Sequence, residues 1–260
     1  MPKIYDCFQF FNELDILEIR LNELNSEVDY FVIVEAETSH QFKPKPLIFN
    51  ENKSRFEKFL NKIIHVIVPA SDFKSNDFWY NENLQRNRIL NGIQDASDED
   101  FIIISDLDEI ISNSSLRNIK NNFVENAYVF EQDLYLWYLN TKVKNYKWTN
   151  AGICRKKYLE KIGTQSFKNN STCKNFPRVQ NGGWHFSYIG DEERIKVKLE
   201  NFAHAEFGHL TKDDLKKNRN NLADPLGRSG EGIELVKEEI HMMPTYIQEN
   251  IDKFKNFIRE

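Results

Sequence analysis

The sequence is poor in the residues that define several common protein classes. It contains three cysteines, seven prolines and ten glycines in 260 residues. This content of proline and glycine excludes collagen-like and low-complexity architectures. The cysteines, Cys7, Cys154 and Cys173, are odd in number and show no C-x-x-C spacing, which favours a reduced, cytoplasmic protein over a disulfide framework. Because Cys7 sits in an apolar run, we expect it to pack as a small hydrophobic residue.

Long apolar runs and basic blocks are absent as well. No run approaches the roughly 20 residues needed to cross a bilayer, and the N-terminus lacks the apolar region and cleavage site of a signal peptide. We therefore expect no transmembrane segment. With 35 basic and 40 acidic residues, the net charge is −5, which speaks against a dedicated nucleic-acid binder. An anionic ligand would need a metal or a few placed cations.

Aromatic and aliphatic residues are plentiful. Twenty Phe, ten Tyr and four Trp contribute to a hydrophobic content of 40%. That content excludes a disordered chain, because burial of these side chains can offset the entropy lost on folding. The length suits one sizeable domain, or one domain with an extension.

Short apolar runs alternate with helical patterns in the first half. Leu14, Leu17, Leu21 and Leu24 recur at helical spacing after a possible N-cap at Asn12. This alternation predicts an α/β fold with a mostly parallel sheet covered by helices on both faces. Ligands of such sheets bind beyond the carboxyl ends of the strands. The expected strands are 4–10, 30–34, 63–68 and 101–104, and the expected helices are 14–24, 51–60 and 81–93.

The second half is less regular. We expect strands over 127–139 and 147–153, a helix over 192–202, and a mostly helical stretch over the last fifty residues. The chain would thus form one domain over 1–210, with a helical C-terminal extension over 211–260 packed on it. The glycine-containing segment 224–232 is either a lid over a ligand or a connector between helices.

Two carboxylates follow the apolar run 101–104. In an extended chain the side chains of Asp106 and Asp108 point to one side, where they can share a divalent cation. The alternative is that Asp108, Glu109 or Ser112 caps the next helix.

Two histidines also lie in suggestive positions. Gly182 and Gly183 precede His185 and indicate that the backbone approaches something closely there. His185 could complete an oxygen and nitrogen ligand set suited to Mn²⁺, or it could be a core residue. Glu206 near His204 could be a general base, or a surface acid paired with that histidine.

Cations and aromatic rings offer further candidates. Arg86 could clamp a phosphate or orient an aspartate, or it could be a solvated helical charge. Lysines in the loop 43–46 could reach a diphosphate. Three tryptophans could stack on sugars or belong to the core: Trp137, Trp148 and Trp184.

Taken together in order, these segments resemble glycosyltransferase family 17. The blocks that carry the resemblance are 5–24, 28–36, 43–47, 85–87, 104–110, 182–188 and 204–207. An ordered set over roughly residues 4–207 is far more specific than an isolated D-x-D motif. Beyond about residue 210 no motif matches.

The resemblance implies a GT-A-like (Rossmann-like) fold and an inverting, metal-dependent glycosyltransferase. The cofactor would be Mn²⁺ or Mg²⁺. A sugar, GlcNAc favoured, would move from a UDP-sugar to a hydroxyl of a glycan or glycoconjugate. Two rivals stay open: a metal-dependent hydrolase of a nucleotide-sugar or sugar phosphate, and a non-catalytic nucleotide- or sugar-binding module.

The resemblance also implies roles for particular residues. Asp191 stands where the family usually has a glycine, so it is not assigned as the base. The general base would be Glu206, with Glu193 behind it. The metal ligands would be Asp106, Asp108, as the direct ligand, and His185; the nucleotide side would be Asn12, Glu13, Glu35, Lys45, Arg86 and Asp106.

Overall fold

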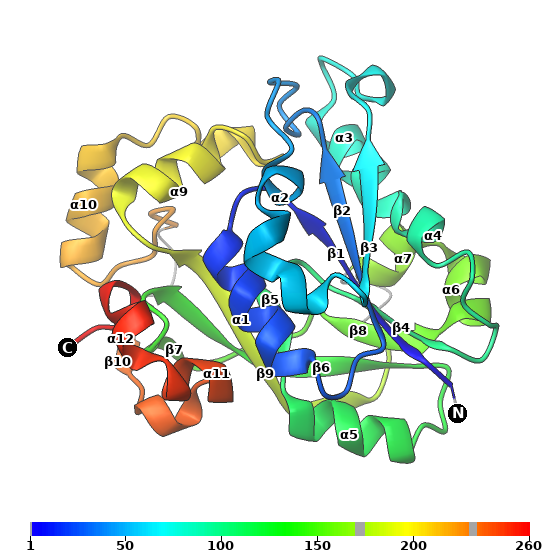
Figure 1. Ribbon diagram of the computed structural model, residues 1–260. Coiled ribbons are helices and arrows are strands. Elements are labelled where there is room, and N and C mark those ends of the chain that lie inside the picture. The colour runs from blue at the N-terminus through cyan, green and yellow to red at the C-terminus, as the bar shows by residue number, and fades with distance from the viewer. Residues whose placement is uncertain (1, 170–174, 229–232) are drawn as a thin grey trace.

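A central sheet with helices on both faces dominates the computed structural model, which describes residues 2–169, 175–228 and 233–260 (Figure 1). Ten strands of these residues form one sheet in the order β10-β7-β6-β8-β4-β1-β2-β3; β9 also pairs with β6, and β5 pairs with β9. The predicted α/β class with a sheet flanked by helices is therefore confirmed.

The four strands expected in the first half are present and parallel. β1 lies between β2 and β4, and β3 forms the edge beyond β2. β4 is buried along its whole length, because helices cover both faces there, whereas the edge strand β3 is largely half-buried. The bounds are β1 (Ile4–Phe10), β2 (Tyr30–Ala36), β3 (Ile63–Val68) and β4 (Phe101–Ile104).

The second half adds a mixed, partly antiparallel portion. β6 pairs antiparallel with β7 and β8 and parallel with β9, so the parallel order that the sequence predicts extends only over β1–β4. The single strand expected over 147–153 is wrong, because residues 149–151 separate two strands. The bounds are β5 (Glu109–Ile111), β6 (Ala127–Trp137), β7 (Thr141–Trp148), β8 (Gly152–Arg155), β9 (Arg178–Ile189) and β10 (Leu235–Lys237).

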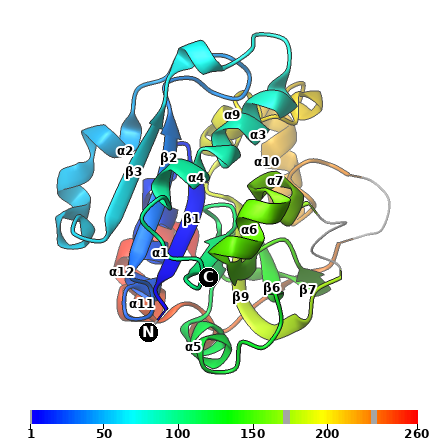
Figure 2. The same ribbon diagram turned by 90° about the vertical axis from the view of Figure 1, so that its right-hand side faces the viewer.

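Alternate side chains of β1 enter two different cores. Ile4, Phe8 and Phe10 pack under α1 (Leu14–Leu24), α2 (Ile48–Glu51) and the 3₁₀ helix η1 (Lys53–Phe59). Tyr5 and Cys7 face the other side, as expected for Cys7. There the cover is α3 (Phe78–Asn87), α4 (Ile89–Gly92), α6 (Lys156–Ile162) and α7 (Thr164–Lys168), as Figures 1 and 2 show.

Some predicted helix details differ. The stretch over 51–60 is divided into α2 and η1 rather than one helix. The N-cap of α1 is Glu13, not Asn12; no side chain caps this end, and the carboxylate of Glu13 accepts from the backbone N–H of Asn12 at 3.2 Å. The remaining helices are η2 (Ala70–Asp72), α5 (Asn113–Asn121), α9 (Glu192–Leu199), η3 (Ala205–Phe207), α10 (Lys212–Asn220), η4 (Ile240–Met242), α11 (Thr245–Glu249), α12 (Ile251–Phe254) and η5 (Lys255–Phe257).

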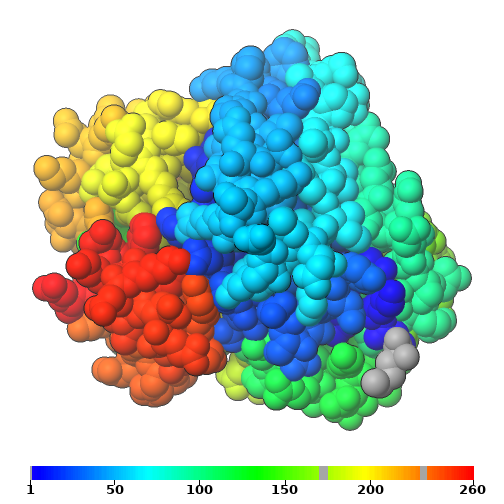
Figure 3. Space-filling view, viewed as in Figure 1, coloured from blue at the N-terminus to red at the C-terminus, as the bar shows by residue number. Residues whose placement is uncertain are grey.

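The C-terminal tail lies directly against the first half of the chain (Figure 3). Glu18 on α1 accepts hydrogen bonds from Tyr246 and Lys253, and β10 pairs with β7. The tail thus carries helices and one strand, and the division of the chain at residue 210 stays a prediction. Within the part of the chain that the structure describes, no helix has the length and apolar character needed to cross a membrane.

Candidate functional site

A cavity of about 470 Å³ opens above the carboxyl ends of the parallel strands. Its floor comes from the end of β1 and from the segment 105–108 that follows β4, which we call the D-x-D loop. Residues of α3, α7, α9 and β9 form its walls. Strand ends of this kind carry the ligand site in open α/β sheets.

A buried arginine holds the D-x-D loop in place. Arg20 on α1 is fully buried and forms an ion pair with Asp6 of β1. Its Nη1 donates to the carbonyl oxygens of Asp106 at 2.8 Å, Leu107 at 3.0 Å and Glu109 at 3.1 Å. This role of Arg20 was not predicted from the sequence. A signal was available, because Asp6 and Arg20 each lie among apolar residues that are expected in the core. Charges buried in a core are usually paired with each other.

Asp106 faces two cations. Its carboxylate lies 3.3 Å from Arg86 Nη2 and 3.2 Å from Lys168 Nζ, and 41% of the side chain is exposed. Partial removal from water would raise the pKa of Asp106, but Lys168 and Arg86 outweigh that effect and lower the pKa to about 2. Asp106 is therefore ionised at neutral pH.

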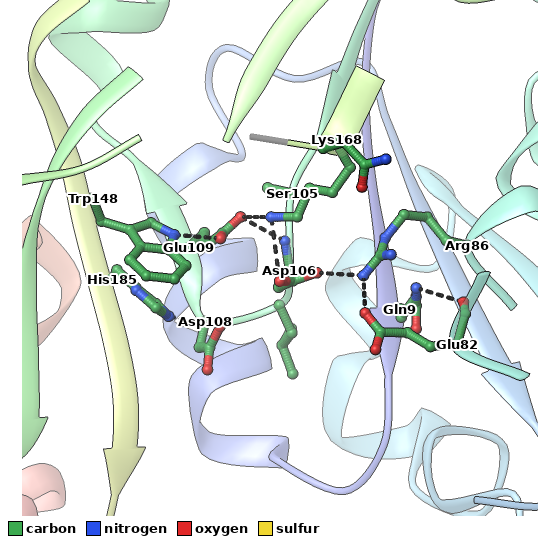
Figure 4. Close-up of polar contacts among 12 residues, drawn as sticks. Gln9, Glu82, Arg86, Ser105, Asp106, Asp108, Glu109, Trp148, Lys168 and His185 are labelled. Carbon is green, nitrogen blue, oxygen red and sulfur yellow. Dashed lines mark hydrogen bonds and ion pairs between the residues drawn. The ribbon is translucent and has the colours of Figure 1, made fainter. Parts of the chain in front are cut away.

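Asp108 faces a histidine and a lysine. Its Oδ1 lies 3.5 Å from His185 Nε2, and its Oδ2 accepts from Lys198 Nζ at 2.9 Å. Burial opposes the charge, but Lys198 and His185 outweigh it and hold the pKa of Asp108 well below its usual range. The D-x-D loop is not a strand, so the two aspartates do not share partners as an extended chain would predict (Figure 4).

Asp108 and His185 fit two positions around a divalent cation. Among residues 2–169, 175–228 and 233–260, no three side chains of His, Cys, Asp or Glu converge as a ligand set. A Mg²⁺-like ion bound by one or two protein groups takes its other ligands from phosphate oxygens and water, and an imidazole suits Mn²⁺. His185 Nδ1 is buried with no hydrogen-bond partner in the described structure. The ring contacts Trp148, with ring centroids 4.5 Å apart, and its Nε2 faces Asp108.

Glu109 supports both ends of this arrangement from below. Its carboxylate accepts from Trp148 Nε1 at 2.6 Å, from Lys168 Nζ at 2.5 Å and from the backbone N–H of Asp106 at 2.8 Å. The sequence had left Glu109 open as a possible helix cap. The cap of α5 is instead Ser112, whose hydroxyl accepts from the backbone N–H of Ser115.

The residues predicted for the nucleotide side are only partly brought together. Glu13, Lys45 and Arg86 line the cavity with Asp106, and Asn12 lines a smaller neighbouring pocket. Glu35 does not line either pocket. It is fully buried and accepts from the backbone N–H of Phe49 at 2.8 Å, which anchors the start of α2 to β2.

The two glutamates predicted as base lie on exposed segments. Glu206 is 57% exposed and pairs with His204 Nδ1 at 2.7 Å, which matches the surface pairing that the sequence left open. Glu193 is 63% exposed and pairs with Lys212. Neither is among the residues that line the cavity. Asp191, which the sequence did not assign as base, caps α9 by accepting from the backbone N–H of Arg194.

The glycines before His185 do mark a close approach. Gly183 has φ +129°, and a Cβ built there would lie 2.1 Å from the carbonyl oxygen of Ile110. The neighbour is therefore the backbone of β5, which pairs with β9 at this point and sets Glu109 opposite His185. The glycines serve the site indirectly, by letting β5 and β9 meet.

The remaining candidates divide between cavity and core. Trp148 lines the cavity, whereas Trp137 is fully buried and donates to the carbonyl oxygen of Ala223. Trp184 packs against the core and donates to the carbonyl oxygen of Met242. Of the segment 224–232, expected as either a lid or a connector, residues 229–232 lie outside the described structure, as does Cys173. In the first part of the segment Arg228 pairs with Asp224.

The fold and the cavity define an α/β protein whose parallel strand ends carry paired acids and cations. Comparison with known sequences identifies the family: residues 1–223 match glycosyltransferase family 17, and the chain belongs to it. The β-1,4-mannosyl-glycoprotein 4-β-N-acetylglucosaminyltransferases of Rattus norvegicus and Homo sapiens are each 22% identical to this chain. In both cases 97% of this chain is covered but 54% of the relative, so the chain spans about half the length of these relatives.

Solved structures with similarity to the chain include the following two. One is the 4-diphosphocytidyl-2C-methyl-D-erythritol synthase of Anaerococcus prevotii, with 13% identity, a TM-score of 0.45, and coverage of 79% of this chain and 96% of that one. The other is a glucose-1-phosphate thymidylyltransferase, described as putative, of Bacillus anthracis. It has 10% identity, a TM-score of 0.43, and coverage of 81% and 97%.

Proposed function

We propose that the chain is an inverting, metal-dependent glycosyltransferase that moves a sugar from a UDP-sugar to a hydroxyl of a glycan or glycoconjugate. The favoured sugar is GlcNAc. The observation that carries the proposal is the pair of Asp108 Oδ1 and His185 Nε2, which face each other at 3.5 Å in the cavity. Membership of glycosyltransferase family 17 and the names of the relatives support the reaction class.

In this proposal Asp108 and His185 hold Mn²⁺ or Mg²⁺, which would neutralise charge that develops on the departing UDP. Arg86 and Lys168 lie beside Asp106 and supply fixed positive charge for the diphosphate. Burial would lower the pKa of both groups, but Asp106, together with Glu82 at Arg86 and Glu109 at Lys168, outweighs that effect and raises each pKa, so both groups remain charged.

The chemical step is one displacement. The bond between the anomeric carbon and the diphosphate oxygen breaks, and its electron pair leaves with UDP. The acceptor oxygen forms the new bond from the opposite face, and its proton passes to a carboxylate. Such a step needs one carboxylate, not the close pair of a retaining glycosidase.

Thermal unfolding with a panel of nucleotide sugars, in Mn²⁺ or in EDTA, tests the proposal. A ligand present at about a hundred times its Kd stabilises the fold by roughly 2.7 kcal/mol. We expect a UDP-sugar to raise Tm only with Mn²⁺, and Asp108→Asn to abolish the rise. Asp252→Asn on the exposed side of α12 is the matched control and should respond as wild type does.

Two outcomes would contradict the proposal. If no nucleotide sugar raises Tm, the proposed nucleotide-sugar donor is wrong. Consumption of the UDP-sugar at full rate without any acceptor would identify a hydrolase instead, because a transferase should hydrolyse its donor only slowly.

A further inference from the structure

One face of α3 presents three chemically different side chains to the cavity. Trp79, Glu82 and Arg86 stand at positions i, i+3 and i+7, which place them on the same side of the helix. All three line the cavity. With a rise of about 1.5 Å per residue, Glu82 lies about 4.5 Å and Arg86 about 10.5 Å along the axis from Trp79.

We propose that this face binds a nucleoside diphosphate along its length, with the base on Trp79, the ribose hydroxyls on Glu82 and the diphosphate on Arg86. The inference rests on the proposed function, and it adds which residues recognise the nucleoside and which way the donor lies. The flat ring, the carboxylate and the guanidinium match the three parts of the ligand in order.

The ring of Trp79 is available for stacking. Trp79 is 49% exposed and lines the cavity. His204 meets it edge to face, with ring centroids 4.6 Å apart at 84°, and Phe202 lies 5.4 Å from His204. These rings form an aromatic corner at one end of the cavity. Stacking of a base on an aromatic side chain tolerates any base, because every base has a π-face.

Glu82 has one oxygen left for the ribose. Its Oε1 accepts from Arg86 Nη2 at 2.6 Å, and among the described residues no hydrogen bond to Oε2 is present. The backbone of Glu82 is fixed as well, because Gln9 Nε2 donates to its main-chain carbonyl oxygen at 3.2 Å. A carboxylate oxygen at this position can accept from ribose hydroxyls, as acidic residues do in dinucleotide sites.

The direction of the ligand follows from the two ends of the site. Figure 4 shows Glu82 and Gln9 at one end, Asp108, His185 and Trp148 at the other, and Asp106 between them. A diphosphate on Arg86 therefore reaches Asp106 and Asp108, and the sugar that follows it lies toward Trp148. The acceptor enters from that side, whereas His204 and Glu206 lie at the base end, away from the reacting atoms.

Calorimetric titration with three probes tests the assignment, each in the presence of Mn²⁺: UDP, 2′-deoxy-UDP and inorganic pyrophosphate. We expect Trp79→Ala to weaken the binding of UDP by about tenfold or more, since stacking contributes only to binding of the nucleoside. The affinity for pyrophosphate should be unchanged. We expect Glu82→Gln to reduce the preference for UDP over 2′-deoxy-UDP. Tyr146→Ala is the control, because Tyr146 is 45% exposed on β7 and does not line the cavity.

The outcomes separate this inference from the proposed function. If wild type binds UDP and Trp79→Ala binds it equally well, the base lies elsewhere and the inference is overturned while the donor stands. An equal loss of UDP and pyrophosphate in Trp79→Ala also overturns it, since the effect would then be structural. If wild type binds pyrophosphate but no nucleotide, both proposals fail.

Discussion

The guanidinium of Arg20 and the carboxylate of Asp6 form a two-point contact in the core, with Nε to Oδ2 at 2.8 Å and Nη2 to Oδ1 at 2.5 Å. Both side chains are fully buried. The pair joins α1 to β1, and the remaining nitrogen of Arg20 supports the D-x-D loop from below. A fold contact made by residues 6 and 20 thus sets the geometry of residues 106–109.

Arg20→Met should destabilise the fold and disturb the site. Loss of the cation leaves Asp6 buried without its partner, and breaking such a pair costs about 3–5 kcal/mol. Urea unfolding measures this loss. Arg20→Lys keeps the charge but not the fork of donors, so it should cost less.

The double variant Arg20→Met, Asp6→Leu separates stability from loop support. It removes the unpaired charge, so we expect it to regain part of the free energy of unfolding. UDP binding with Mn²⁺ should not recover, because the carbonyl groups of the D-x-D loop still lack their donor. Recovery of both properties would mean that Arg20 does not position the loop.

Lys198 neutralises Asp108 and should compete with a metal there. Its Nζ lies 2.9 Å from Asp108 and 3.3 Å from Glu13, and these acids raise the pKa of Lys198 against the effect of burial. Lys198→Met should therefore bind Mn²⁺ several-fold more tightly than wild type in the absence of nucleotide, as measured by calorimetry. The control Lys196→Met lies on the same helix but outside the cavity and should bind Mn²⁺ as wild type does. Equal affinity in wild type and Lys198→Met would contradict the competition.

Much of the fold was predictable because the parallel strands are short apolar runs. Ile4–Phe10 and Ile63–Val68 match the predicted bounds. The second half was not, because the long strand β6 has three partners and register shifts, which no single pattern encodes. At the site, Asp108 and His185 lie within 3.5 Å of each other, and their role as metal ligands stays a prediction. A contact of Arg86 with an aspartate was one of the alternatives that the sequence left open, and Asp106 is that aspartate. The contact of Asp106 with Lys168 was not predictable, because Lys168 lies far away in the sequence and carries no motif.

Substitution of the exposed Glu206 and Glu193 tests whether either carboxylate is the general base. General base catalysis contributes about 10²–10⁴-fold to a rate. Since Glu206 and Glu193 do not line the cavity, we expect Glu206→Gln and Glu193→Gln to keep transfer rates within about threefold of wild type. The assay follows release of UDP with acceptor present. A hundredfold loss in Glu206→Gln, with UDP binding intact, would restore Glu206 as the base.

Gly183→Ala should be strongly destabilising. Its φ of +129° disfavours any side chain, and the new Cβ would collide with the carbonyl oxygen of Ile110. We expect a loss of more than about 2 kcal/mol in urea unfolding, since strain and overpacking add. Gly163→Ala is the matched control. It has φ +83° but no atom within 4 Å of the new Cβ, so it isolates the backbone strain. Equal losses at the two positions would show that contact between β5 and β9 is not tight.

Glu18 should make the attachment of the tail depend on pH. Burial would raise the pKa of Glu18, but hydrogen bonds from Lys253, Tyr246 and Arg55 outweigh it and lower the pKa. A carboxyl whose pKa is lower in the folded than in the unfolded state stabilises the fold above the unfolded value, about 4.3. That contribution is lost as pH falls through the folded value.

We therefore expect Glu18→Gln to lower the free energy of unfolding by about 1–3 kcal/mol at pH 7, as for a hydrogen-bonded charge. The difference from wild type should shrink as pH falls below about 4, because the wild-type carboxyl is then protonated too. Urea unfolding between pH 7 and pH 3 measures it. Glu57→Gln, at an exposed position of η1, is the control and should follow wild type at every pH. A difference that stays constant down to pH 3 would show that the charge of Glu18 does not hold the tail, and that the shape of the side chain does.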